Sequence, residues 1–536
     1  MAASVTILLM AAACACLGAG PAAALEALPV LARIGPWPAV SNLVGYGERL
    51  WLVNSVRFQK HNSADVYSYD PATGEVRYER QLFSQSAGQP MVDRGLLYWP
   101  FEDARASLGF GHFMVTDGER WRLETIASPP IFHIRAMAAP GGRLVAATSA
   151  RQAALHASGD QGASWQRVYE HATPVGQTSG IAEVATRVPF TFGYLSSQEQ
   201  QRLLRFDGER VEPVPGWPSG LPVLALAAWR EQVWGLVWEG DGISLWRTDG
   251  EQSTRAIPIQ ARWPARDLAA GGDGLWALTA TPSGGELWLT TDGTSWERQA
   301  TLAGGRPHEL VAWQDAVFVG GLGRDGRGVL WGPSAWRPLP DGVPGDLAMP
   351  APPDGKANDW DAAGAALDQA LADPDSYDER GRVLRDLVWE LALLQPPAGF
   401  FAARLSSRFP DRALPLIDDQ TVIPAAKLAR WILLWGMAVA GGGEVPKALL
   451  EEPWRAPANS SHKYFEAAPA AMWAAGVIGQ DDPGTIETLL ARLERPDDPL
   501  WLKGDAVGAL SALTGQRFAY DAAAWRAWWR SAAPPR

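Results

Sequence analysis

The chain has 536 residues, of which 47% are hydrophobic and 20% are charged. This hydrophobic fraction can bury enough surface to offset chain entropy, so the composition excludes disorder as the main state. The formal net charge of −12 opposes binding to a polyphosphate, so nucleic acid is not expected as a partner. The 55 Gly, 42 Pro and 27 Trp indicate a globular chain that is rich in turns and aromatic residues.

The N-terminal segment has the features of an export signal. A largely apolar run over residues 5–17 is followed by small residues that end at Ala24. This pattern predicts a signal peptide over residues 1–24; a retained membrane anchor is the alternative. Cleavage would remove Cys14 and Cys16, the two cysteines of the chain. We therefore expect a secreted or periplasmic protein with no stable membrane span, no disulfide and no thiolate metal site.

A turn motif that contains Asp, usually followed by Gly, recurs about every 44 residues in the first two thirds of the chain. The copies are centred on Asp70, Asp117, Asp160, Asp207, Asp249 and Asp292, with a degenerate copy at Gly332. Short apolar runs bounded by turn residues indicate about four strands in each unit. Seven such units predict a seven-bladed β-propeller over residues 37–340, with six or eight blades and a β-solenoid as alternatives. Residues 25–36 form an N-terminal segment that could supply a closing strand.

The copy that runs from Ser158 to Trp165 resembles the Asp-box, or BNR, repeat of sialidase-like propellers. The copies at Asp117 and Asp292 are one residue shorter, and three others lack the Trp. The resemblance implies a structural turn away from any active site, in which the carboxylate binds backbone N–H groups and the Trp packs between blades. The residues to which it gives this role are Asp117, Asp160, Trp165, Asp207, Asp249, Asp292 and Trp296.

The last third of the chain changes from strand to helix patterning after a linker, residues 341–357, that is rich in Pro and Gly. Amphipathic or apolar segments predict helices over residues 378–393, 425–439, 462–477, 485–493 and 505–513. Residues 509–529 resemble the closing helix pair of bacterial HEAT-like repeat proteins, in which a Trp cluster covers the end of the solenoid. The resemblance implies an α-helical, HEAT-like array over residues 358–536, so the chain is a multidomain β plus α protein.

Propeller ligands usually bind in the funnel where the innermost strands begin. The four-strand plan places these polar side chains near that face: Arg57, His61, Arg105, His133, Arg135, Arg266, Asp267, His308 and Glu309. Together they could bind an anion, a sugar or a metal, and a solvated rim is the alternative. The seven His have no paired spacing, so we expect no metal and no cofactor.

These features favour an exported, non-enzymatic interaction or ligand-binding protein whose propeller and helical surfaces bind a protein or glycan partner. The first alternative is a sialidase-like glycoside hydrolase or lyase that acts on extracellular saccharide, with Arg57, Arg135 and Arg266 as a carboxylate clamp. The sialidase Arg-Ile-Pro signature is missing from the sequence, and no catalytic residue is assigned. The second alternative is an assembly factor similar to the Asp-box propellers that assist photosystem assembly.

Overall fold

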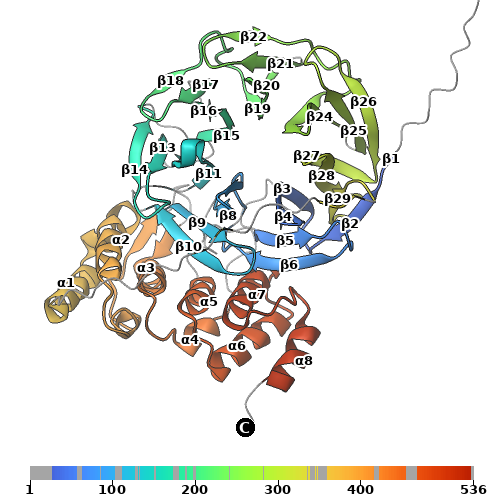
Figure 1. Cartoon of the computed structure of the whole chain (residues 1–536). Helices are drawn as coiled ribbons and strands as arrows, with labels where there is room; N and C mark the ends of the chain where they lie inside the picture. The colour runs from blue at the N-terminus through green and yellow to red at the C-terminus, as the bar shows by residue number, and fades with distance from the viewer. Residues whose placement is uncertain are drawn as a thin grey trace, which may run out of the picture.

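The protein is described by a computed structural model that covers part of the chain. It describes residues 27–532 apart from 57–62, 85, 103–110, 127–130, 132, 150–151, 173–179, 188–189, 197–200, 241, 282, 335, 339–344, 346, 348–358, 416–421 and 454–466. The expected signal segment lies outside the described residues, as do Arg57, His61, Arg105 and most of the expected linker. The described strands form a closed ring, and helices pack along one part of its outer edge (Figure 1).

Seven four-stranded antiparallel blades make the ring, which confirms the predicted seven-bladed β-propeller. From the centre outward, blade 1 consists of β3 (Ala39–Tyr46), β4 (Arg49–Ser55), β5 (Asp65–Tyr69) and β6 (Val76–Gln81). Blade 2 consists of β7 (Met91–Asp93), β8 (Leu96–Pro100), β9 (Gly111–Thr116) and β10 (Trp121–Ile126). Blade 3 consists of β11 (His133–Ala138), β12 (Leu144–Ser149), β13 (Ala153–Ser158) and β14 (Gln166–Glu170).

The remaining blades follow in chain order, and the last of them takes a strand from the other end of the ring. Blade 4 consists of β15 (Gly180–Arg187), β16 (Phe190–Ser196), β17 (Gln201–Phe206) and β18 (Val211–Pro213). Blade 5 consists of β19 (Val223–Trp229), β20 (Gln232–Trp238), β21 (Ile243–Thr248) and β22 (Ser253–Arg255). Blade 6 consists of β23 (Ala265–Gly271), β24 (Gly274–Thr281), β25 (Gly284–Thr290) and β26 (Glu297–Ala303). Blade 7 consists of β27 (Gly305–Trp313), β28 (Ala316–Gly323), β29 (Gly328–Trp331) and β2 (Val30–Ile34).

The N-terminal strands join the two ends of the ring. β2 pairs antiparallel with β29 as the outer strand of blade 7, and β1 (Ala27–Leu28) pairs parallel with β26 of blade 6. The degenerate turn at Gly332 is therefore not followed by a strand of its own in blade 7. Trp336 instead packs edge-on against Trp313 and Phe318 and donates a hydrogen bond from Nε1 to Asp315.

The middle strands of the blades are apolar on both faces because neighbouring blades cover both sides. β8 and β29 are buried along their whole length, whereas the outer strand β14 is half-buried or exposed throughout. This burial explains why continuous apolar runs, and not only alternating ones, mark these strands in the sequence.

Eight α-helices occur among the described residues of the C-terminal third. They are α1 (Trp360–Ala372), α2 (Asp378–Leu393), α3 (Ala425–Ala440), α4 (Lys447–Leu450), α5 (Ala467–Ile478), α6 (Pro483–Glu494), α7 (Leu500–Thr514) and α8 (Ala522–Ala532). A short hairpin, β30 (Ala413–Pro415) and β31 (Val422–Pro424), precedes α3. Helices α2, α3, α5 and α7 pack side by side in one row, while α4, α6 and α8 form a second row.

The helical row contacts the ring through α7, which packs against β6 of blade 1 (Figure 1). One continuous apolar core runs from blade 1 into the helices, and it includes Leu52 and Phe83 of the propeller as well as Val507 and Leu510 of α7. Because this core crosses the junction, the helices are packed onto the propeller and are not merely tethered to it.

Candidate functional site

The inner strands share a distortion near the face at which they begin. In β3, β11, β15, β19, β23 and β27 the pairing with the next strand shifts by one residue. In the last three of these strands the shift falls at Leu224, Arg266 and His308, which are 42 residues apart. A β-bulge of this kind bends the strand and leaves backbone N–H groups unpaired within the sheet.

Two of the predicted site residues tie neighbouring blades together at these bulges. Asp267 of blade 6 accepts a hydrogen bond at Oδ2 from the backbone N–H of Leu310 in blade 7, at 2.7 Å. Glu309 of blade 7 accepts from the N–H groups of Asn42 and Leu43 in blade 1, at 2.9 and 3.2 Å. These carboxylates therefore satisfy backbone donors that the bulges expose, which is a structural use of residues that we expected to face a ligand.

The same kind of contact continues around the inner ring. Asn42 donates from Nδ2 to the carbonyl oxygen of Gly88 in blade 2, at 3.1 Å. The backbone N–H of Gln89 in turn donates to the carbonyl oxygen of Arg135 in blade 3, at 2.8 Å. Hydrogen bonds thus link five consecutive blades, from blade 6 through blades 7, 1 and 2 to blade 3.

The predicted residues of blade 3 pair with blade 2. Arg135 forms an ion pair with Glu102, with 2.7 Å between Nη1 and Oε1, and its side chain is mostly buried. The His133 imidazole contacts the backbone carbonyl oxygen of Glu102 through Nδ1. The structure therefore brings His133 and Arg135 together around one residue, Glu102.

The predicted residues do not all meet in one group. Asp267 and Glu309 lie at successive blade junctions, and Arg266 and His308 are the residues immediately before them. Arg266 is exposed and His308 is half-buried. His133 and Arg135 belong to a separate junction, between blades 2 and 3.

A second polar cluster, which the sequence did not reveal, joins the propeller to the helices. Asp65 of β5 is fully buried and accepts hydrogen bonds from Trp37 Nε1 at 2.7 Å, Ser63 Oγ at 2.8 Å and Tyr520 Oη at 2.6 Å. Three donors surround this carboxylate, and one of them comes from the loop between α7 and α8. Asp65 therefore acts as an acceptor that fixes the helices on blade 1.

Two further contacts extend this junction. Gln81 at the end of β6 donates from Nε2 to Asp505 of α7, at 2.9 Å. Arg517 pairs with the buried Glu79 of β6 at 2.9 Å and with Glu119 of blade 2 at 3.1 Å. Burial raises the pKa of Glu79, while hydrogen bonds from Ser68 and Arg77 and the charge of Arg517 act in the opposite direction.

The recurrent Asp turns lie between the third and fourth strands of their blades, at the opposite end from the starts of the inner strands. Asp207 and Asp249 each accept hydrogen bonds at Oδ1 from the N–H groups two and three residues later. Asp292 and Asp117 do the same within their turns. Hydrogen bonds from the Ser164 side chain and backbone lower the pKa of Asp160 to about 2.

The tryptophans that follow two of these turns pack between blades. Trp165 packs edge-on against Phe113 of blade 2, and Trp296 packs against the core shared by blades 5 and 6.

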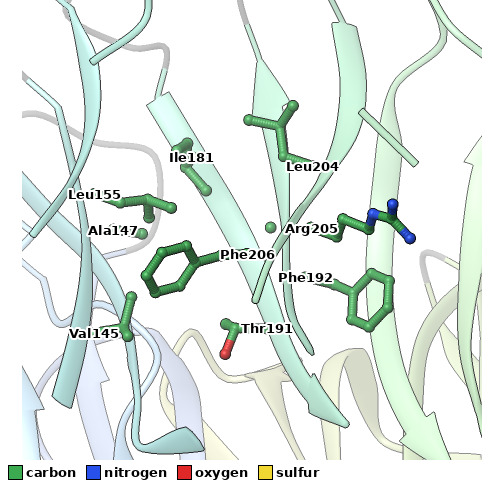
Figure 2. Close-up of a pocket in the computed structure, with 10 residues that line it drawn as sticks. Val145, Ala147, Leu155, Ile181, Thr191, Phe192, Leu204, Arg205 and Phe206 are labelled. Carbon is green, nitrogen blue, oxygen red and sulfur yellow. The ribbon is translucent and has the colours of Figure 1, made fainter. Parts of the chain in front are cut away.

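Figure 2 shows an apolar cavity between blades 3 and 4. Its walls are formed by Val145, Ala147, Leu155, Ile181, Thr191, Phe192, Gly193, Leu204, Arg205 and Phe206. The Thr191 hydroxyl is buried and has no hydrogen-bond partner within the described part of the chain. Apart from Thr191 and Arg205, the residues that line this cavity are apolar.

Where the structure describes the chain, it holds no group of three or more His, Cys, Asp or Glu side chains that could bind a metal ion. Burial lowers the pKa of His156 to about 4, so its imidazole is neutral at physiological pH. The imidazole Nδ1 lies 3.2 Å from Oγ1 of Thr148.

In the same described residues, no helix is both long and apolar enough to cross a membrane.

Comparison with protein-family models finds no match, and neither does comparison with curated proteins. Among solved structures, the chain is similar to YCF48 from Cyanidioschyzon merolae, with 13% identity and a TM-score of 0.40 over 57% of this chain and 99% of that chain. It is also similar to streptogramin B lyase, with 10% identity and a TM-score of 0.44 over 57% of this chain and 96% of that chain. A chain of a nidogen–laminin complex matches at 8% identity and a TM-score of 0.32, over 51% of this chain and 97% of that chain. These names refer to different roles, and the propeller assignment rests on the strand order of this chain.

Proposed function

We propose that this protein is an exported, non-enzymatic interaction protein in which a propeller and a helical array form one binding scaffold for a protein partner. The observation that carries the proposal is the junction around Asp65, where a side chain of the helical region, Tyr520, donates to a buried carboxylate of blade 1. A buried hydrogen bond of this kind fixes orientation, because leaving either group unpaired would cost free energy.

The fixed junction supports a scaffold role because it holds the propeller surface and the helical surface in one relative orientation. The row of helices α2, α3, α5 and α7 extends along the outside of the ring (Figure 1). We propose that this row is a HEAT-like array and that the propeller is of the Asp-box type. Repeat arrays of both kinds present extended surfaces on which a partner can bind without a deep pocket.

The hydrogen bonds and the ion pair that the inner-rim side chains already form also favour a binding role over a catalytic one. A sialidase-like clamp would need Arg135 to receive a substrate carboxylate, but its guanidinium already pairs with Glu102. Asp267 and Glu309 accept hydrogen bonds from backbone N–H groups of the next blade, so using them as general acid or base would loosen the ring.

Affinity capture from the native cell envelope tests the proposal. The full chain and the variant Asp65→Ala, which loosens the junction, would serve as baits, and every candidate partner would be purified and its binding measured directly. We expect a purified protein partner to bind the full chain and to bind the variant more weakly. If the chain instead hydrolyses members of a glycoside panel, and Arg135→Ala abolishes that activity, the proposal is overturned in favour of the hydrolase alternative.

A further inference from the structure

One rim of the ring carries four exposed arginines on two adjacent blades. Arg262 and Arg266 of blade 6 and Arg306 and Arg324 of blade 7 are all exposed. None of these four forms an ion pair with a carboxylate of the described residues. Other exposed or half-buried arginines of the propeller do pair with Asp or Glu, as at Arg33, Arg205, Arg255 and Arg298.

The four arginines belong to one face of two adjacent blades. Arg306 lies at the start of the inner strand β27 and pairs in register with Leu322 of β28, while the backbone N–H of Arg324 donates to Gly304 at 3.1 Å. Arg306 and Arg324 therefore lie at the same end of this hairpin. Arg266 belongs to the bulge of β23, next to the tie between Asp267 and blade 7, so Arg266 and Arg306 lie on neighbouring inner strands. Arg262 lies in the segment that leads into β23 at the same end of the blade.

The acidic groups nearest to these arginines in the sequence are already engaged. Asp267 and Glu309 accept backbone N–H groups, and Asp325 pairs with Arg33. The four arginines outnumber the negative charges of Asp267 and Glu309, so this part of the rim is positive on a chain whose formal net charge is −12. Charge that is concentrated on one face and left unpaired favours a partner of opposite sign.

We infer that Arg262, Arg266, Arg306 and Arg324 form a binding surface for an acidic segment of a protein partner. The inference rests on the proposed scaffold role and adds the chemistry of the partner. Arginine suits this recognition because its planar guanidinium binds a carboxylate through two parallel hydrogen bonds.

The neighbouring tryptophan favours a peptide over a saccharide as the source of the carboxylates. Trp263 is 39% exposed, which is enough to contact a partner. The Arg262 guanidinium, however, lies over its ring at 5.1 Å from the centroid and so covers one face of the indole. A sugar could stack only on the other face of this indole, whereas an acidic peptide can bind the guanidinium groups without using the indole.

Fluorescence anisotropy with labelled poly-L-glutamate tests the inference on the full chain. We expect saturable binding that weakens with added salt and falls about fivefold in the double variant R306A/R324A, because each exposed charge pair contributes modestly. The matched control is R167A/R255A, which removes the same charge from arginines that pair with Glu170 and Glu239. The control should bind like the unmodified chain.

Two results with these polymers would overturn the inference. One is equal affinity of R306A/R324A and R167A/R255A for poly-L-glutamate. The other is tighter binding of polygalacturonate than of poly-L-glutamate, which would identify an acidic saccharide as the ligand. A purified protein partner that binds the chain and R306A/R324A equally well would leave the scaffold proposal intact while this inference fails.

Discussion

Two junctions of this molecule differ in their polar contacts. Where blade 1 meets the helices, buried polar contacts accompany the shared apolar core, with Asp65, Gln81 and Glu79 each bonded to a residue beyond α6. Where blade 3 meets blade 4, the contact is apolar, rich in alanine, and leaves a cavity (Figure 2). A polar junction fixes one geometry because each donor needs its acceptor, whereas an apolar junction depends on shape and tolerates small gaps.

The largest effect is expected at the apolar junction, from removal of the buried ring of Phe206. Phe206 of β17 is fully buried against blade 3, so Phe206→Ala would enlarge the existing cavity and lower the free energy of unfolding by about 4 kcal/mol. Urea unfolding followed by tryptophan fluorescence measures this loss. Phe206→Leu is the control and should cost about 1 kcal/mol. Similar losses in the two variants would show that this junction is not held together by packing.

The next largest effect is expected at the polar junction. Asp65→Ala would leave three buried donors, on Trp37, Ser63 and Tyr520, without an acceptor and would lower the free energy of unfolding by about 3 kcal/mol. Tyr520→Phe removes one of these hydrogen bonds and should cost about 1 kcal/mol. Faster proteolysis within the helical region of Asp65→Ala would locate the loss at the junction, and unchanged proteolysis would argue against Asp65 as its anchor.

A smaller effect is expected at the ring closure between blades 7 and 1. Glu309→Ala would leave the backbone N–H groups of Asn42 and Leu43 without their carboxylate acceptor, at a cost of about 2 kcal/mol. Glu309→Gln retains one acceptor oxygen and should cost less. Hydrogen exchange at Asn42 and Leu43 would report the change directly. If exchange at these amides stays slow in Glu309→Ala, the side chain does not tie the blades together.

The fold was predictable from the sequence because propeller blades repeat. In each unit the turn lies between the third and fourth strands. A turn such as that of Asp207 therefore recurs at a regular interval, which the sequence alone reveals. The seventh copy is the exception, because blade 7 obtains its outer strand from residues Val30–Ile34 at the other end of the chain. A pairing over such a sequence distance leaves only a weak local signal.

The roles of the site residues were less predictable, because they depend on contacts between distant blades. The sequence predicts that Asp267 and Glu309 face a ligand site, but it does not show the bulges whose N–H groups donate to their carboxylates. Asp65 and Tyr520 are 455 residues apart, and neither belongs to a motif. Nor does the sequence show that Arg262, Arg266, Arg306 and Arg324 form no ion pair with a described carboxylate.

The smallest loss in free energy of unfolding is expected from Arg517→Ala. The pH dependence of this loss shows whether Arg517 stabilises the polar junction by its charge or by packing. Burial raises the pKa of Glu79 above its ordinary value of 4.5, so folding favours the protonated form and this contribution to stability is lost as the pH rises. Arg517 opposes the rise in pKa, so Arg517→Ala should cost little near pH 4 and about 1 kcal/mol near pH 8. Urea unfolding at the two pH values measures the difference, with Lys447→Ala, which breaks the exposed pair with Glu451, as a control that should cost almost nothing at either. An equal cost of Arg517→Ala at both pH values would mean that the side chain stabilises the junction by packing and not by its charge.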